Sequence, residues 1–473
     1  MRVLVTGGTL VTASGQVRAD LLCTDGRIAG ILESGGAAAA DERVDASGLL
    51  VFPGFIDPHV HSRDPGQTAK EDFAHSTLAA LCSGVTTLLE MPNAVPPISD
   101  RATFEERAAA HERTASVDFG LWGQAFGASN LDDLPGLLDA GAVAIKLFWG
   151  YALDKRTKKL VYNTGDAAPD DIIAPPDAGD VLRVFEVIGA RGGLLAAHCE
   201  DREIVLGGER AIGGEIRTYQ DLLDGRPALA EIAAVSRAAE FSRVTGCRFH
   251  VVHTSTARAL EIVRAARADG IPITAEACPH YLLLSDADHE RYGSGMKVFP
   301  PIRGADDQEA LWAAIADGTV ASVGSDHAPH TLEELEGSLA TRPAGVHGVE
   351  TMVPLMLNEM ARGRLAPERV AAVLAEQTAR LYSIDHRKGR IAPGLDADLT
   401  LVDPHRERRI VAGELHTKHK ASVYDGWTVR GTAVASLLRG EVVMRDGEPV
   451  AQRRGRLVRT SAAEAADAAV SVA

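Results

Sequence analysis

Two histidines stand two residues apart in the stretch GFIDPHVHSRDPG, residues 54–66. In a β-strand, residues i and i+2 lie on the same face, so His59 and His61 would project side by side and Arg63 would extend their row. Imidazoles bind metal ions, and a guanidinium binds anions. A His-x-His pair alone is weak evidence, because two polar residues at the end of a strand give the same pattern.

Residues of the same chemical types end later apolar runs. His198 ends GGLLAAH, His253 ends CRFHVVH, and Asp326 follows VASVGS. Each of them alone is explained as well by a buried core histidine or a turn residue. If the runs are parallel strands of a barrel, however, their carboxyl ends meet at one face and these side chains converge there. Together, in order and all at strand ends, these residues are explained better by a shared functional site than by separate structural roles.

Lys146 lies inside the apolar run AVAIKLFW, residues 142–149. Lysines are rarely buried unless they are paired. Burial lowers the pKa of an ammonium group and favours the neutral, nucleophilic amine. The sequence therefore indicates a chemical role for Lys146.

The elements that would position these residues alternate along residues 53–387. After the first run at 54–61, strands are expected at 84–91, 142–149, 192–198, 247–253, 272–277 and 320–325. Segments of helical period lie at 102–113, 179–190, 228–243, 256–268, 307–316 and 366–380. This alternation predicts an α/β fold, a (β/α)8 barrel of TIM type, with a doubly wound parallel sheet as the alternative.

Strand-like patterns without intervening helices occupy both ends of the chain. Residues 1–52 contain β-branched runs separated by Gly-Gly and Asp-Gly turn pairs, and similar runs return over residues 388–456. We predict that the two ends pair into one small β-sandwich domain beside the barrel. Residues 457–473 are rich in small residues, which predicts a flexible tail or an arm onto a neighbouring subunit.

The composition excludes several classes of function. The chain has 473 residues with a formal net charge of −16 and no visible basic stripe, which argues against nucleic-acid binding. Its five scattered cysteines form no CxxC pair and fit a reducing compartment. The first residues lack the zones of a signal peptide, and no apolar run approaches membrane-spanning length. We therefore expect a cytoplasmic protein that binds neither nucleic acid nor membranes.

The ordered motifs DPHVH, IKLF, AAHCED, VVHTST and GSDHAPH resemble those of the amidohydrolase superfamily. Within it the chain is similar to the cyclic amidohydrolases, which include dihydroorotase, allantoinase, hydantoinase and dihydropyrimidinase, and the similarity spans nearly the whole chain. The resemblance implies a (β/α)8 barrel that hydrolyses a ring amide of a small substrate with two zinc ions. A homo-oligomer, a dimer or tetramer, is expected as well.

The resemblance also implies a role for each residue of the site. The expected metal ligands are His59, His61 and Asp326 for the more buried ion, His198 and His253 for the second, and Lys146 for both. Lys146 would be carboxylated at N6 by CO₂, because a carbamate can bridge two cations whereas a neutral amine cannot. A hydroxide shared by the zinc ions would attack the amide, and Asp326 would pass its proton to the leaving nitrogen.

The opening stretch favours dihydroorotase as the activity. The order His59, His61, Arg63 followed by DPG is similar to the dihydroorotase pattern, in which the arginine binds a substrate carboxylate. We therefore expect an anionic substrate. The residues expected to contact it are Arg63, Asn93, Arg303 and His330.

Other features are more typical of allantoinases and hydantoinases, which are the alternative. They are EACPHYLLL at 276–284 and KHKASVYDGW near the C-terminus. In addition, KVFPPIR has Phe299 where Asn is expected in many relatives, which puts the exact substrate in doubt. Residues 150–177 form a long insertion that would lie at the active-site face, as a lid or as a solvated loop. A non-catalytic scaffold and a mononuclear deaminase are disfavoured, because all six ligand positions are filled and the bridging lysine is present.

Overall fold

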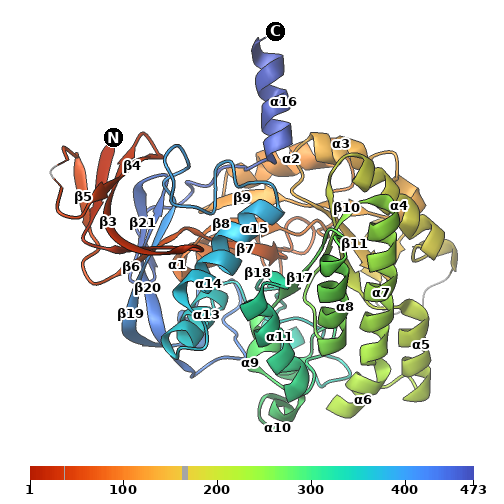
Figure 1. Ribbon diagram of the computed structural model, residues 1–473. Coiled ribbons are helices and arrows are strands. Elements are labelled where there is room, and N and C mark those ends of the chain that lie inside the picture. Colours follow the sequence, from red (N-terminus) through yellow and green to blue (C-terminus); the bar gives the residue numbers. More distant parts are fainter. Residues whose placement is uncertain (37, 162–168, 473) are drawn as a thin grey trace.

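The computed structural model describes residues 1–36, 38–161 and 169–472 of the chain. A barrel and a β-sheet domain lie side by side (Figure 1). The barrel strands are β7 (Phe55–Val60), β8 (Val85–Glu90), β9 (Asp118–Leu121), β10 (Gly123–Ala125), β11 (Ile145–Trp149), β15 (Leu194–Cys199), β16 (Arg248–Val251), β17 (Ile273–Ala277) and β18 (Val320–Val323).

The barrel strands run parallel in two hydrogen-bonded groups, β7-β8-β9 and β10-β11-β15-β16-β17-β18. β9 and β10 follow each other across Trp122, which links the groups on one side. On the other side the main-chain N–H of His61 donates to the carbonyl of His327 at 2.9 Å, joining the residues after β7 to those after β18. The predicted (β/α)8 barrel is confirmed, and the carboxyl ends of its strands meet at one face.

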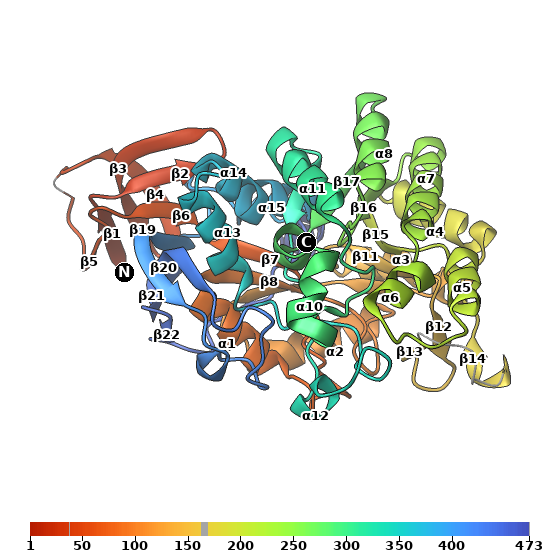
Figure 2. The same cartoon turned by 90° about the horizontal axis from the view of Figure 1, so that it is seen from below.

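Helices cover the outside of the barrel, as Figures 1 and 2 show. They are α1 (Phe73–Ser83), α2 (Arg101–Glu112), α3 (Leu134–Asp139), α4 (Ala178–Ala190), α5 (Arg202–Ala211), α6 (Tyr219–Gly225), α7 (Ala228–Thr245), α8 (Ala257–Ala268), α9 (Pro279–Leu283), α10 (His289–Tyr292), α11 (Ala305–Asp317), α12 (Leu332–Leu335), α13 (Met352–Ala361), α14 (Pro367–Ala371) and α15 (Gln377–Leu381). The segment expected as one helix at 366–380 is divided by a π-helical turn, Ala372–Glu376.

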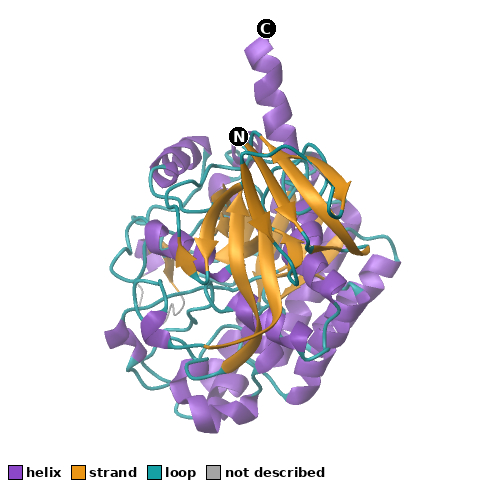
Figure 3. Cartoon of the chain, turned by 90° about the vertical axis from the view of Figure 1, so that its left-hand side faces the viewer, coloured by secondary structure: helices purple, strands orange, loops and turns teal. Residues whose placement is uncertain are grey.

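The two ends of the chain build one sheet, which faces the viewer in Figure 3. Its strands are β1 (Arg2–Thr6), β2 (Thr9–Thr12), β3 (Gly15–Thr24), β4 (Arg27–Glu33), β5 (Glu42–Asp45), β6 (Leu50–Pro53), β19 (Leu399–Arg409), β20 (Thr428–Leu438), β21 (Glu441–Arg445) and β22 (Glu448–Pro449). The N- and C-terminal parts meet where β6 pairs antiparallel with β19, with Leu399 opposite Pro53. The predicted pairing of the chain ends beside the barrel is therefore confirmed.

The insertion after β11 forms a small antiparallel sheet of order β13-β12-β14, from β12 (Ala152–Asp154), β13 (Leu160–Val161) and β14 (Ile172–Ile173). Figure 2 shows it at the end of the barrel that lies away from the β-sheet domain. Residues 162–168 of the insertion lie outside the described residues. The role of this segment as a lid stays a prediction.

The C-terminal residues expected as a flexible tail form helix α16 (Ser461–Val472), which projects from the body of the molecule (Figure 1). Glu464 in its first turn contacts Nε2 of His386 at 2.9 Å and accepts from Arg387 at 3.1 Å. Alanine has the highest helix propensity, so a run of small residues specifies a helix once its start is anchored. Neither α16 nor any other helix of the described residues combines the length and apolar character needed to cross a bilayer.

A buried ion-pair network joins the barrel to the β-sheet domain. The Nζ atom of Lys388 contacts the carboxylates of Asp118 on β9 and Asp398 just before β19, and lies 2.9 Å from that of Asp396. Burial acts to lower the pKa of Lys388, but the three carboxylates outweigh it and raise this pKa above its ordinary value. The three aspartates resemble a metal site, and the lysine ammonium already occupies its centre.

Lys388→Met is expected to lower the free energy of unfolding by about 3–5 kcal/mol, because it leaves the buried Asp398 without an ion-pair partner among the described residues. Asp118 and Asp396 would keep their ion pairs with Arg439 and Arg387. Urea denaturation followed by circular dichroism measures this loss. The exposed Lys155→Met is the matched control, and a surface change of this kind costs less than about 0.5 kcal/mol. Equal losses in the two variants would contradict a stabilising role for Lys388.

Candidate active site

Three of the predicted metal ligands meet at the carboxyl ends of β7 and β18. The Nε2 atoms of His59 and His61 lie 3.3 and 3.5 Å from Oδ1 of Asp326. All three side chains are buried, and one ligand atom from each lies within 4.8 Å of the other two. This arrangement can hold one metal ion.

His198, His253 and Lys146 lie beside this cluster. Nδ1 of His198 is 3.2 Å from Nε2 of His253, and the rings of His253 and His59 are 5.5 Å apart. Lys146 on β11 is paired in register with Ala196 on β15, two residues before His198, so both side chains project to the same side. The barrel therefore brings all six predicted ligands together.

Several buried atoms of this cluster have no hydrogen-bond partner among the described residues. They are Nε2 of His59, Nδ1 of His253 and Nζ of Lys146. Buried polar atoms in native proteins are almost always satisfied, so these atoms require an explanation. Coordination of metal ions by the imidazoles, and a carboxylated lysine, would satisfy them. The donor set thus fits a metal centre.

The electrostatic surroundings suit the same chemistry. Burial lowers the pKa of Lys146 to about 8, although Asp326 and Glu276 act in the opposite direction. Burial also lowers the pKa of His61 to about 4, so its imidazole is neutral and keeps a lone pair for a metal. Burial raises the pKa of Asp326, but His59, His61 and His253 outweigh this and hold it well below its ordinary value.

Glu276, which we did not predict from the sequence, orients two of the histidines. Its Oε1 lies 2.7 Å from Nδ1 of His59 and accepts the main-chain N–H of His253 at 3.1 Å. When Nδ1 of His59 donates to this carboxylate, Nε2 faces the metal site. The signal in the sequence is a glutamate inside the apolar run PITAEA, where a buried charge needs a partner.

A second buried network orients His198. Its Nε2 lies 2.7 Å from Oε2 of Glu200 and 3.2 Å from the hydroxyl of Tyr151. Arg226 forms an ion pair with Glu200 and donates to the Tyr151 hydroxyl at 3.1 Å. The Arg226 guanidinium also stacks 3.7 Å from the centre of the Phe299 ring. The Phe299 ring therefore packs against the Arg226 guanidinium and stabilises its positive charge.

Three of the site residues have positive backbone φ angles, 61° for Arg63, 39° for His253 and 45° for Asp326. Non-glycine residues rarely adopt this conformation, and those that do concentrate at functional sites. Around Asp326 the turn is held by Ser325, whose N–H donates to the buried carboxylate of Asp57 at 3.0 Å. Surrounding contacts thus fix the direction of the Asp326 carboxylate.

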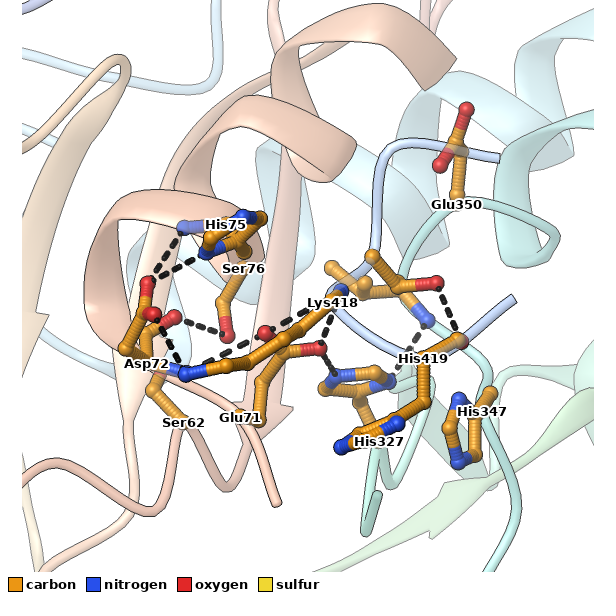
Figure 4. Close-up of polar contacts among 12 residues, drawn as sticks. Ser62, Glu71, Asp72, His75, Ser76, His327, His347, Glu350, Lys418 and His419 are labelled. Carbon is orange, nitrogen blue, oxygen red and sulfur yellow. Dashed lines mark hydrogen bonds and ion pairs between the residues drawn. The ribbon is translucent and has the colours of Figure 1, made fainter. Parts of the chain in front are cut away.

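The residue after Asp326 belongs to a polar network that reaches the C-terminal part of the chain (Figure 4). Nε2 of His327 lies 3.6 Å from Oε2 of Glu71, and both side chains are fully buried. Glu71 also accepts the main-chain N–H of Lys418, and Nζ of Lys418 lies 3.1 Å from Asp72, the N-cap of α1. The KHK motif at 418–420 therefore packs against the loop that precedes α1, close to the metal ligands.

A cleft of about 400 Å³ opens beside the cluster, and its lining includes Arg63, Asn93 and His330, as the sequence suggests. Asn93 connects the cleft to the metal ligands, because its Oδ1 lies 2.6 Å from Nδ1 of His61. Nδ1 of His330 accepts from Nζ of Lys70 at 3.1 Å. Asn93 and His330 thus have protein partners, and their contacts with substrate stay predictions.

Arg303 lies in a different environment. It is buried, its Nε donates to the hydroxyl of Ser255 at 3.2 Å, and its Nη2 donates to the carbonyl of Arg226 at 3.0 Å. Arg303 is absent from the described lining of the cleft. Arg303 holds the main chain of Arg226 through this hydrogen bond. Its expected contact with an anionic substrate stays a prediction, and the lining of the cleft does not support it.

Comparison with known proteins places this fold and site in a family. Residues 50–443 match the model of the amidohydrolase family. The chain is 38% identical over 467 residues to an allantoinase of Rubrobacter xylanophilus, covering 97% of both proteins. It is 32% identical over 460 residues to an L-hydantoinase of Paenarthrobacter aurescens, covering 95% of this chain and 96% of that protein.

A solved structure of L-hydantoinase from Arthrobacter aurescens matches with a TM-score of 0.89 at 31% identity, covering 97% of this chain and 99% of that one. These relatives favour allantoinases and hydantoinases over dihydroorotase, which corrects our expectation of a closest resemblance to dihydroorotase. The chain belongs to the amidohydrolase family, as a metal-dependent cyclic amidohydrolase.

Proposed function

We propose that this protein hydrolyses the ring amide of a hydantoin, as an allantoinase or a hydantoinase. The observation that carries the proposal is the near-full-length similarity to proteins of these two names. Allantoin is itself a hydantoin with a ureido substituent, so an allantoinase and a hydantoinase would hydrolyse the same type of ring amide. The buried ligand cluster beside a cleft supports the same reaction.

The proposed roles follow from where the residues lie. The ligands would be His59, His61 and Asp326 for one metal ion, His198 and His253 for a second, and carboxylated Lys146 for both. Bound zinc ions would lower the pKa of a water molecule and polarise the amide carbonyl. Asp326 would take a proton from this water at its carboxylate and deliver it to the ring nitrogen as the C–N bond breaks. The product would be a ring-opened ureido carboxylate.

Dihydroorotase is the second candidate, because one observation favours it. Arg63 lines the cleft together with Asn93 and His330, and a guanidinium in this place can bind a ring carboxylate. Such a carboxylate is present in dihydroorotate and absent from hydantoin, allantoin and dihydrouracil.

A substrate panel tests the proposal. The purified, zinc-loaded protein is assayed in parallel with allantoin, hydantoin, dihydroorotate and dihydrouracil, and the metal-depleted protein is the control. We expect the highest kcat/KM on a hydantoin ring and no turnover without metal. The highest kcat/KM on dihydroorotate would overturn the proposal in favour of the second candidate.

Arg63→Met is expected to lower kcat/KM for the hydantoin substrate about ten- to hundredfold and to leave the zinc content unchanged. A hydrogen bond to a charged group is worth about 1.5–3 kcal/mol, and Arg63 lines the cleft next to the metal ligands. Steady-state kinetics and metal analysis measure the two effects. Arg258→Met, on the exposed face of α8, is the control for the change in net charge.

A loss of several thousandfold that is confined to dihydroorotate would instead restore the dihydroorotase assignment. A loss of zinc from Arg63→Met would show that the arginine supports the loop rather than the substrate.

A further inference from the structure

The cleft beside the metal ligands is strongly basic, although the chain as a whole has a formal net charge of −16. Among its described lining residues none is acidic, and five are basic: Arg63, Lys70, Lys159, Lys297 and Arg342. Glu334 lies near these basic residues, and its carboxylate is 2.6 Å from Nζ of Lys70. Like charges in one cleft repel each other, and an anion bound among them relieves this repulsion.

Lys297 and Arg342 are the most informative members of this group. Nζ of the buried Lys297 donates to the carbonyl of Leu339 at 2.5 Å, and Nη1 of Arg342 donates to the carbonyl of Leu335 at 2.7 Å. Nε of Arg342 is buried without a hydrogen-bond partner in the described part of the chain. Neither side chain forms an ion pair with a carboxylate of the described residues. Lys297 is buried and Arg342 is half-buried, and such cations are costly without a counter-charge, so an anionic ligand would offset this cost.

The same cleft also adjoins the metal ligands. Its lining includes Asn93, which bonds to His61, so a ring held against Asn93 lies next to the metal ligands. The side chains of Leu160 and Phe299 supply apolar surface in the same lining as Lys297. A substituent attached to the ring can therefore contact this apolar surface and present its far end to the basic side chains.

We propose that Lys297 and Arg342, with Lys70 and Lys159 beside them, form a subsite for an anionic substituent on the cyclic substrate. This inference rests on the proposed function and narrows it. The preferred substrate is a hydantoin that carries an acidic group on a short arm, for example a carboxylate. The ureido group of allantoin is uncharged, so this class differs from allantoin.

A matched pair of probes tests the subsite. The acid is 5-(2-carboxyethyl)hydantoin and its neutral isostere is 5-(2-carbamoylethyl)hydantoin, each used as both enantiomers with the zinc-loaded protein. We expect kcat/KM to be at least about tenfold higher for the acid at low salt, because hydrogen bonds between charged groups are the strong ones. This preference should shrink as salt rises, since salt screens charges in an open cleft. Equal values for the acid and the amide would overturn the proposal.

Substitutions test whether Lys297 and Arg342 cause the preference for the acid over the amide. Arg342→Met and Lys297→Met should each lower the ratio of kcat/KM for acid over amide about tenfold, whereas Arg258→Met on the outside of α8 should leave the ratio unchanged. Zinc content and circular dichroism report whether each variant is folded. A ratio that is unchanged in both cleft variants, or lowered equally in Arg258→Met, would overturn the proposal.

Direct binding separates this inference from the proposed function. Calorimetry with the same two probes measures their dissociation constants without requiring turnover. Tighter binding of the acid together with no hydrolysis of either probe would refute the proposed function and support the subsite. Hydrolysis of both probes with equal affinity and equal kcat/KM would support the function and refute the subsite.

Discussion

Replacing Lys146 by alanine is expected to abolish hydrolysis and to lower the zinc content of the purified protein. Lys146 is fully buried beside the histidine cluster, its Nζ has no hydrogen-bond partner in the described structure, and burial lowers its pKa to about 8. An amine with this pKa is partly neutral near pH 8, so it can add to CO₂, release a proton and become an anionic carbamate. The carbamate would then bridge two cations that a neutral amine cannot bridge.

The test of Lys146 combines turnover, metal analysis and rescue. Short carboxylic acids added to Lys146→Ala should restore part of the activity by occupying the place of the carbamate, and they should leave the wild type unchanged. Lys155→Met, an exposed substitution in the insertion, is the control for the loss of a lysine. Full zinc content and wild-type turnover in Lys146→Ala would refute the carbamate bridge.

Asp326→Asn is expected to reduce kcat by roughly a hundredfold or more, because proton transfer by a positioned carboxylate contributes about 10²–10⁴. The amide keeps the shape of the side chain but cannot accept the proton. Steady-state kinetics on the zinc-loaded variant measures the loss. Asp139→Asn, an exposed change at the end of α3, is the control. A variant with near-full turnover would remove Asp326 from the proton transfer.

The same residue predicts the direction of the pH dependence. The histidines around Asp326 hold its pKa well below the ordinary value, so the carboxylate is ionised at neutral pH and can act as a base. Activity should therefore be present above this pKa and fall as the pH decreases toward it, which gives an ascending acid limb. The limb should disappear in the residual activity of Asp326→Asn.

Much of the site could be predicted from the sequence, because each ligand ends or interrupts an apolar run. His198 and His253 stand out against the strands before them, and the positions of those strands follow from period and length. The strands β9 and β10 were harder to predict. A Cβ at Gly120 or Gly123 would come within 2.8 Å of neighbouring side chains, so close packing requires glycine there. Glycine weakens the apolar pattern that identifies a strand.

The groups that orient the ligands could not be predicted in the same way. Glu276 reaches His59 from β17, and Arg226 reaches Glu200 from the turn before α7, so their partners are distant in the sequence. The choice between dihydroorotase and hydantoinase depends on the walls of the cleft. Those walls come from loops whose positions no periodicity specifies. The sequence therefore could not predict that Arg303 is absent from the described lining of the cleft.

The pairing of β6 with β19 has a consequence for the synthesis of the chain. The β-sheet domain is interrupted by the entire barrel, so β6 emerges from the ribosome long before its partner. At roughly 5–20 residues per second, this delay lasts tens of seconds. During that time β1 to β5 can pair among themselves, but the edge of β6 stays open to wrong partners. The β-sheet domain therefore cannot be completed before β19 has been synthesised, and truncation before β19 should yield an aggregation-prone chain.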